Sequence, residues 1–160
     1  MIDDLGPVLA VAGAVGAGLN GGVFFAFSTS VMRALVRLPA SGGVAAMQSI
    51  NREAPSPLFM LLLFGTGVLS IAGGAIALAG WDEPWAPYLL VGSALYLICP
   101  ITTIAYHVPR NIALDELDPD SPAAQQAWAG WHSTWTAANH VRTLACAASA
   151  VAFALAGWAS

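Results

Sequence analysis

Four long apolar stretches constrain the fold more than any other feature of the sequence. Residues 5–32, 57–81, 85–106 and 143–160 contain no ionisable side chain other than tyrosine and cysteine. Each stretch is close to or longer than the roughly 20 residues that a helix needs to cross a bilayer. Because lipid offers no hydrogen-bond partner, the backbone within each stretch has to be helical. We therefore predict an all-α integral membrane four-helix bundle in direct contact with the lipid bilayer.

The composition agrees with a chain that lies mostly in lipid, and it excludes one class of partner. Only 9% of the 160 residues are charged, whereas about a quarter are charged in a typical soluble domain. The five basic residues are spread over the chain and the net charge is −4, so there is no basic patch for nucleic acid. We predict one transmembrane domain over residues 1–160, with spans at about 5–32, 57–81, 85–106 and 136–159.

The arginines indicate how the spans are oriented. Four of the five lie in the two long loops that follow the first and third spans: Arg33, Arg37, Arg52 and Arg110. Because basic loops stay on the cytoplasmic side, both long loops are predicted to be cytoplasmic and both termini outside, in a bacterial inner membrane. Apolar residues recur at helical spacing between Val44 and Ile50, and an Ala- and Trp-rich segment follows Pro122. Each long loop is thus expected to hold a short amphipathic helix.

Small residues lie along one face of the first span. Gly13, Ala17 and Gly21 follow one another at four-residue spacing, which allows a second helix to approach closely. The neighbour is either another helix of the bundle or a second copy of the chain in a homo-oligomer. Asn20 lies near the middle of this span, where we expect either an interhelical hydrogen bond or a polar contact in an internal cavity.

One segment before the last span carries polar groups that are costly to place in lipid. Four side chains there fall within roughly a quarter of a helix circumference: Trp131, Trp135, Asn139 and Arg142. An amide and a guanidinium in this position should face polar groups, water or a ligand. The predicted topology brings further polar residues to the same end of the bundle: Asn51, Arg52, His107, Asn111 and His140. We expect these groups to enclose a cavity.

Several motifs are shared with a known family. They are GVFFAFSTSVMRAL in the first span, MQSINRE in the first long loop, SPLFMLLLFGTG in the second span, HVPRN after the third, and W-x₃-W-x₃-NHVRT before the fourth. In this order, over nearly the whole chain, the sequence resembles the DUF1772 family, which includes the fungal anthrone oxygenases of polyketide pathways. His107 stands where the family usually has Asn, and Arg33 where it has Pro, which leaves room for a different substrate or chemistry.

The resemblance implies an activity and a set of site residues. The activity is that of a monooxygenase, an oxidoreductase that converts an anthrone or a related phenolic aromatic to a quinone with dioxygen and requires no cofactor. The family's Asn-Arg, Pro and Asn, and Trp, Asn, Arg and Thr positions correspond here to Asn51, Arg52, Pro109, Asn111, Trp135, Asn139, Arg142 and Thr143.

The chemistry of this reaction suggests a role for each group. Loss of a proton from the anthrone methylene gives a delocalised enolate, which can pass an electron to dioxygen without metal or flavin. Trp131 and Trp135 are candidates to stack on the flat ring system, and His140 or His107 is the candidate base. The candidate oxyanion donors are Arg142, Asn139 and Arg52. Four further residues complete the candidate substrate-binding set: Asn111, Asn51, Asn20 and Phe24.

Other interpretations of the same residues stay open. The polar groups can instead lock the helices together, with Arg142 paired to Glu53 or an acidic loop residue, and Asn139 bound to a carbonyl near Pro100 or Pro109. A third interpretation is a carrier of small molecules or a membrane scaffold without chemistry.

Histidines suggest one more class, a redox protein. His107 and His140 are expected at similar depths on antiparallel helices, as the axial ligands of a haem would be, and with His132 they make a candidate copper or zinc site. Against a shared metal, His132 and His140 are eight residues apart rather than four.

Overall fold

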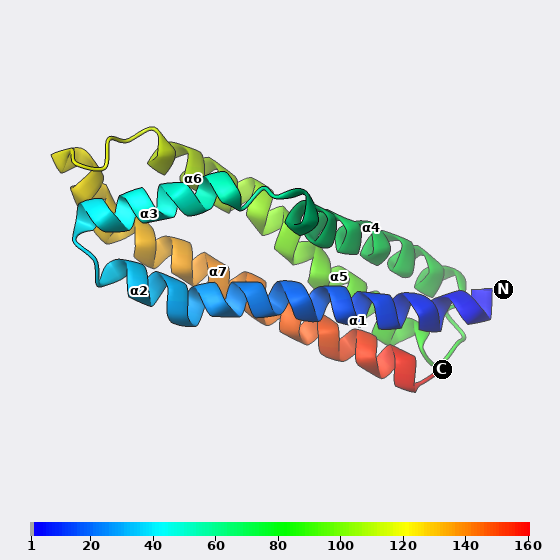
Figure 1. The fold of residues 1–160 in the computed structure, drawn as a ribbon. Helices are drawn as coiled ribbons and strands as arrows, with labels where there is room; N and C mark the ends of the chain where they lie inside the picture. Colours follow the sequence, from blue (N-terminus) through cyan, green and yellow to red (C-terminus); the bar gives the residue numbers. More distant parts are fainter. Residues whose placement is uncertain (1) are drawn as a thin grey trace.

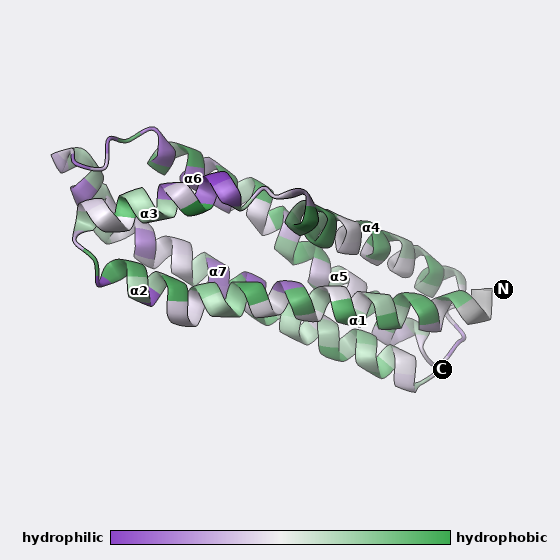
Figure 2. Cartoon of the chain, viewed as in Figure 1, coloured by the Kyte–Doolittle hydropathy of each residue, from purple (hydrophilic) through white to green (hydrophobic). Residues whose placement is uncertain are grey.

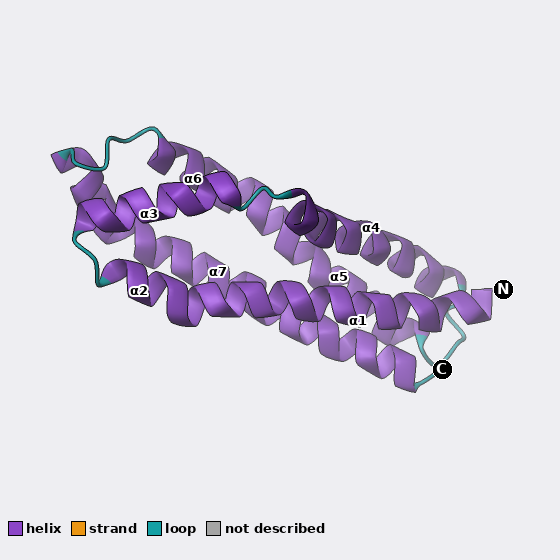
Figure 3. Ribbon diagram, viewed as in Figure 1, coloured by secondary structure: helices purple, strands orange, loops and turns teal. Residues whose placement is uncertain are grey.

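The structure is a computed structural model that describes residues 2–160, with side chains from residue 5 onward. All elements in this range are helical, joined by short loops (Figure 3). In chain order they are α1 (Ile2–Ala26), the π-helical turn η1 (Phe27–Val31), α2 (Met32–Val36), α3 (Ala40–Glu53), α4 (Pro57–Ala79), α5 (Ala86–Thr102), the π-helical turn η2 (Thr103–His107), α6 (Val108–Asp115) and α7 (Pro122–Trp158). The predicted all-α fold is confirmed.

The elements form an elongated bundle of four helical rods (Figure 1). One end carries α3, α6 and the first turns of α7, and we call it the loop end; both ends of the chain lie at the opposite end. The four rods are long and apolar enough to cross a membrane: Leu5–Val36, Pro57–Ala79, Ala86–Asp115 and Pro122–Trp158. The spans are mostly hydrophobic in Figure 2, and hydrophilic residues gather at the loop end. The chain is an integral membrane bundle of four helices, as predicted.

Three of the rods continue beyond the apolar stretches that predicted them, the first only as far as Val36. The third continues through η2 to Asp115, and α7 begins at Pro122 and runs for 37 residues. At 1.5 Å per residue α7 is about 55 Å long, well beyond the roughly 30 Å of a bilayer's hydrocarbon core. Hydropathy marks only the part of a helix that lies in lipid. The helix itself starts where Ser121 caps it, its Oγ accepting a hydrogen bond from the Ala124 N–H at 3.2 Å.

The small-residue face of the first span is used inside the bundle. A Cβ added to Gly13 would lie 2.8 Å from the Phe153 ring of α7, and one added to Gly21 would lie 3.2 Å from Cys146. Close helix approach of this kind is what small residues permit. Of the two neighbours that we considered, the structure therefore shows the one within the bundle. Self-association of the chain stays a prediction.

A second apolar core holds the loop end together. Val44 and Met47 of α3 are buried against Trp128 of α7 and Leu114 of α6, which gives α3 the amphipathic character predicted for it. Gln48 connects α3 to the end of α6, since its Nε2 donates to the carbonyl oxygens of Leu114 at 2.9 Å and of residue 117 at 2.8 Å. Neither carbonyl has an α-helical partner, and the Leu114 oxygen otherwise accepts only the turn bond from the Leu117 N–H at 3.2 Å. The loop end is thus a packed cap on the bundle.

Candidate functional site

Two wide turns shape the rods where they meet α7. π-helical turns are rare and recur at functional sites, and here η1 and η2 both contact α7. The second has a local cause: the ring of Pro109 would clash with the carbonyl of Ala105 in a regular α-helix, and the wider turn removes that clash. The turns place Ser28 and His107 inside the bundle, where they are 6% and 1% exposed.

A cavity of about 140 Å³ lies beside these turns, between α1, α3, the start of α4, η2 with α6, and α7. Its size is close to that of an apolar cavity that holds one benzene molecule. Its wall includes six of the side chains predicted for the site: Phe24, Asn51, His107, Asn111, Trp135 and Arg142. The remaining wall is mostly apolar, with Thr103 as a further polar group. Distant parts of the chain therefore contribute to one cavity wall, although three of the polar residues expected there do not line it: Arg52, Asn139 and His140.

Arg142 is the one charged residue among those that line this cavity. It is 5% exposed, and its guanidinium donates to Thr103 Oγ1 at 3.1 Å and to Asn139 Oδ1 at 2.6 Å. Its central carbon lies 4.3 Å from the ring centroid of Phe24 and 5.4 Å from that of Trp135. Each of these partners is neutral, and Nε is buried without a hydrogen-bond partner. A buried cation with neutral neighbours favours an anionic ligand.

His107 lies in the same wall as a neutral base. Its Nδ1 is 3.2 Å from the Thr102 carbonyl oxygen, which can only accept, so the proton sits on Nδ1. Nε2 then carries the free lone pair, and this atom is buried without a hydrogen-bond partner. The imidazole packs edge-on against Trp135, with ring centroids 5.0 Å apart. His107 and Arg142 therefore both contact the indole of Trp135.

Three tryptophans of α7 form a stack that ends at the cavity. The ring centroids of Trp128 and Trp131 are 5.6 Å apart, those of Trp131 and Trp135 are 5.9 Å apart, and both pairs are stacked. Trp131 donates from Nε1 to the Arg110 carbonyl at 3.1 Å, and Trp135 donates to Asn111 Oδ1 at 2.9 Å. Trp135 lines the cavity, whereas Trp131 supports it from behind.

Asn139 lies behind the cavity wall and holds its parts together. Its Nδ2 donates to the Phe24 carbonyl and to Ser28 Oγ, both at 2.7 Å, while its Oδ1 accepts from Arg142. Asn139 thus positions Arg142 and does not line the cavity. The alternative in which polar groups hold the helices together placed Asn139 on a carbonyl near Pro100 or Pro109. Asn139 does bind a backbone carbonyl, but it is that of Phe24. No ion pair joins Arg142 to Glu53 or to an acidic loop residue among the side chains described.

Of three further predicted residues, two do not line the cavity, Arg52 and Asn20, and the third, Asn51, lines it but is bound to another side chain. Arg52 is exposed on α3 and is not part of the cavity wall. Asn51 lines the cavity and donates from Nδ2 to Asp115 Oδ1 at 3.0 Å. Asn20 is fully buried deeper in the bundle, where its Nδ2 donates to Tyr96 Oη at 2.9 Å. This bond joins α1 to α5, which is the interhelical role considered for it.

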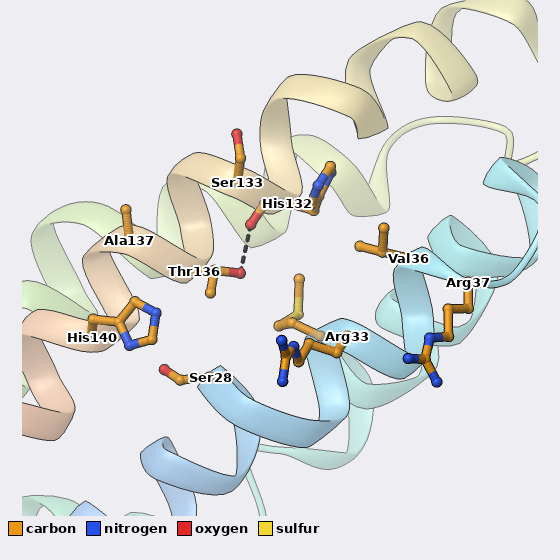
Figure 4. A pocket seen from close by; sticks show the side chains of 10 residues that line it. Ser28, Arg33, Val36, Arg37, His132, Ser133, Thr136, Ala137 and His140 are labelled. Carbon is orange, nitrogen blue, oxygen red and sulfur yellow. Dashed lines mark hydrogen bonds between the residues drawn. The ribbon is translucent and has the colours of Figure 1, made fainter.

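The other two histidines line a separate hollow. His132 and His140 face an open groove of about 550 Å³ between η1–α2 and α7, on which Figure 4 centres. His107 does not line it. An axial pair on one haem needs both rings to face a common space, and His107 and His140 line different hollows. Among the described residues, no group of three His, Cys, Asp or Glu side chains is placed to hold a metal ion.

Some cavity residues were missed by the analysis of the sequence. Thr103 bonds to Arg142 and lies one turn before His107, a spacing that places both on one side of a helix and that the apolar surroundings concealed. The apolar wall includes Phe27, Met47, Phe59 and Met60. Nothing in the sequence separates these side chains from ordinary core residues.

Comparisons with known proteins identify the family. A family model described as anthrone oxygenase matches residues 57–152, which is more than half of the chain. In comparisons with curated proteins and with solved structures, nothing matches. The matched segment contains Thr103, His107, Trp135 and Arg142, so the family match covers the polar part of the cavity wall except Asn51. The protein described here belongs to the anthrone oxygenase family, DUF1772.

Proposed function

We propose that the protein is a membrane oxygenase that converts an anthrone or a related phenolic aromatic to a quinone with dioxygen, using no cofactor. One observation supports this most directly: the buried guanidinium of Arg142 has only neutral partners and lies in the wall of an aromatic-lined cavity beside neutral His107. The site is thus suited to a guest that enters neutral and becomes an anion there.

The reaction divides into steps that these residues can assist. Nε2 of His107 takes a proton from the methylene carbon, and the electron pair moves onto the ring system to give an enolate. Arg142 stabilises the oxyanion, an effect that is stronger in a low-dielectric site than in water. The enolate reduces dioxygen by one electron, the two radicals combine to a peroxide anion at the same carbon, and this anion takes back the proton from His107. Loss of water from the peroxide leaves a carbonyl. In total, anthrone and O₂ give the quinone and H₂O.

The size and the opening of the cavity limit how the substrate can be oriented. At about 140 Å³ it has room for one aromatic ring, so the remaining rings of an anthrone must extend through the opening. The exposed residues of the lining are apolar: Val23, Ala54, Pro55 and Val108. The reacting ring therefore lies inside with the rest of the molecule at the lipid-facing opening, and the substrate enters from the bilayer. By the distribution of arginines, the loop end is on the cytoplasmic side of a bacterial inner membrane.

Oxygen uptake by the purified protein tests this proposal. With an anthrone in detergent micelles, uptake and quinone absorbance should rise together, and Arg142→Ala should lower turnover about 10²–10³-fold through loss of an oxyanion donor. Arg110→Ala is the matched control, because its side chain lies over the Tyr106 ring outside the cavity. Undiminished turnover in the Arg142 variant would rule the mechanism out. A visible absorption spectrum of the same sample separates the proposal from a haem protein.

A further inference from the structure

The open groove at the loop end has a chemistry different from that of the cavity. It is bounded on one side by η1 and α2 and on the other by α7, and its volume is about 550 Å³. Figure 4 shows Arg33 and Arg37 on the α2 side and His132 and His140 on the α7 side. The groove is thus lined by basic groups from two rods, and the mechanism above uses none of them.

The charge of the groove has a single sign. The chain has nine acidic residues and a net charge of −4, yet no carboxylate lines this groove. Arg33 and Arg37 are one helical turn apart, so their guanidinium groups can reach one ligand. Both are exposed, and the hydrogen bonds and ion pairs formed among the described residues do not engage either guanidinium. Such a pair is free to bind an anion, and phosphate oxygens match the donor geometry of guanidinium.

The position of the groove indicates which kind of molecule carries the anion. The two arginines directly follow the uncharged stretch of the first span, which ends at Met32, and so lie where an apolar span meets the polar surface. Met32 and Val36 of α2 and Ala137 of α7 add apolar side chains to both walls of the groove. A groove that combines basic and apolar side chains at the end of a membrane span fits an amphiphile with a negative headgroup.

We infer that this groove binds the phosphate group of an anionic phospholipid. The headgroup phosphate lies between Arg33 and Arg37, with His132 and His140 on the facing helix, and the acyl chains leave the groove toward the bilayer. The inference is independent of the proposed oxidation, because it uses a different hollow and different residues.

Lipid binding to the purified full-length protein tests the inference. Native mass spectrometry in detergent counts the molecules of phosphatidylglycerol or phosphatidylcholine that stay bound. We expect a preference for phosphatidylglycerol, and about a thirty-fold weaker affinity in the Arg33→Gln/Arg37→Gln variant, from the contribution of each basic residue at an anionic surface. Arg33→Lys/Arg37→Lys should keep much of the preference, and Arg110→Gln, which changes a loop-end arginine outside the groove, should keep all of it.

Three outcomes decide the matter. Equal retention of the two lipids by the unmodified protein would overturn the inference, as would an undiminished preference in the Arg33→Gln/Arg37→Gln variant. Inorganic phosphate provides the arm for a free anion: if it displaces the bound phosphatidylglycerol at millimolar concentration, the lipid is not the source of the anion and the inference fails. Thermal unfolding of each variant shows that a loss of binding is not a loss of fold.

Discussion

At the scale of single side chains, the proposed function gives different tasks to two neighbouring residues of the cavity wall, Arg142 and His107. The guanidinium of Arg142 makes hydrogen bonds only to the neutral groups of Thr103 and Asn139, so negative charge that develops in the cavity is favoured over a neutral guest. His107 offers an unshared lone pair on Nε2, because its Nδ1 proton points to a carbonyl. One residue can create the charge that the other holds, and the indole of Trp135 contacts both.

His107→Gln should separate the base from the other candidates. Glutamine keeps a polar side chain of similar length but cannot take up a proton, so turnover should fall about 10²–10⁴-fold, the usual range for a lost general base. Stopped-flow recording of quinone formation from an anthrone measures it. Tyr106→Phe is a control, since its hydroxyl bonds to the Thr134 carbonyl outside the cavity. A larger loss in His140→Gln than in His107→Gln would assign the proton transfer to the groove side instead.

At the scale of elements, the two π-helical turns decide which side chains face α7. A regular helix over the same residues would rotate the following positions by about 100° per residue inserted or removed. With the turn η2, His107 is 1% exposed and lines the cavity. The register of this rod is therefore part of the site, although the turn itself contributes backbone geometry and no chemistry.

Pro109→Ala should weaken the site without weakening the helix. Alanine removes the clash that favours the wide turn and restores a backbone donor, so the segment can return to α-helical register and carry His107 away from the cavity. Turnover should drop about a hundredfold, the cost of a misplacement of about 1 Å, while the thermal unfolding midpoint stays level or rises. Circular dichroism and turnover on the same sample measure both. A variant with normal turnover would show that tertiary packing alone holds η2.

Some parts of the fold and of the site can be predicted from the sequence and others cannot. The spans were predictable because long uncharged stretches are stable only in lipid. Arg142 and Trp135 were predictable as site residues because a guanidinium and an indole lie on one face of the same helix. Trp131 lies on that stripe too, yet its indole bonds to the Arg110 carbonyl, a partner that exists only once α6 is in place. The wide turns were not predictable from hydropathy, because Pro109 marks an irregularity near η2 without fixing its register, and no proline lies near η1.

At the scale of the whole molecule, one aromatic ring joins three of the four rods. A Cβ added to Gly13 of α1 or to Gly92 of α5 would lie 2.8 Å from the ring of Phe153 on α7. The ring is 1% exposed and fills the space that both glycines leave open. The packing of Phe153 between the two glycines therefore fixes the position of α7 relative to α1 and α5. Since α7 also carries Trp135 and Arg142, this packing helps to position the cavity wall.

Gly13→Ala and Gly92→Ala should each destabilise the bundle by about 1–3 kcal/mol, the usual cost of an added methyl group in a packed core. Gly18→Ala is the matched control, because a Cβ there has no atom within 4 Å and alanine favours the helix. Thermal or denaturant unfolding in detergent gives the ranking. Equal stability of Gly13→Ala and Gly18→Ala would mean that the helices adjust around Phe153 at no cost.

The hydrogen bonds of Asn139 restrict which side chains can replace it. Its carboxamide gives two hydrogens to Phe24 and Ser28 and its oxygen to Arg142. Aspartate has no hydrogen-bond donor and would neutralise the charge of Arg142. Leucine has a similar volume but can form none of the three hydrogen bonds. Glutamine is longer by one methylene group, so its amide would be displaced from these partners. Since this one amide joins α1 and η1 to Arg142, each of these three substitutions would disturb contacts to more than one element at once.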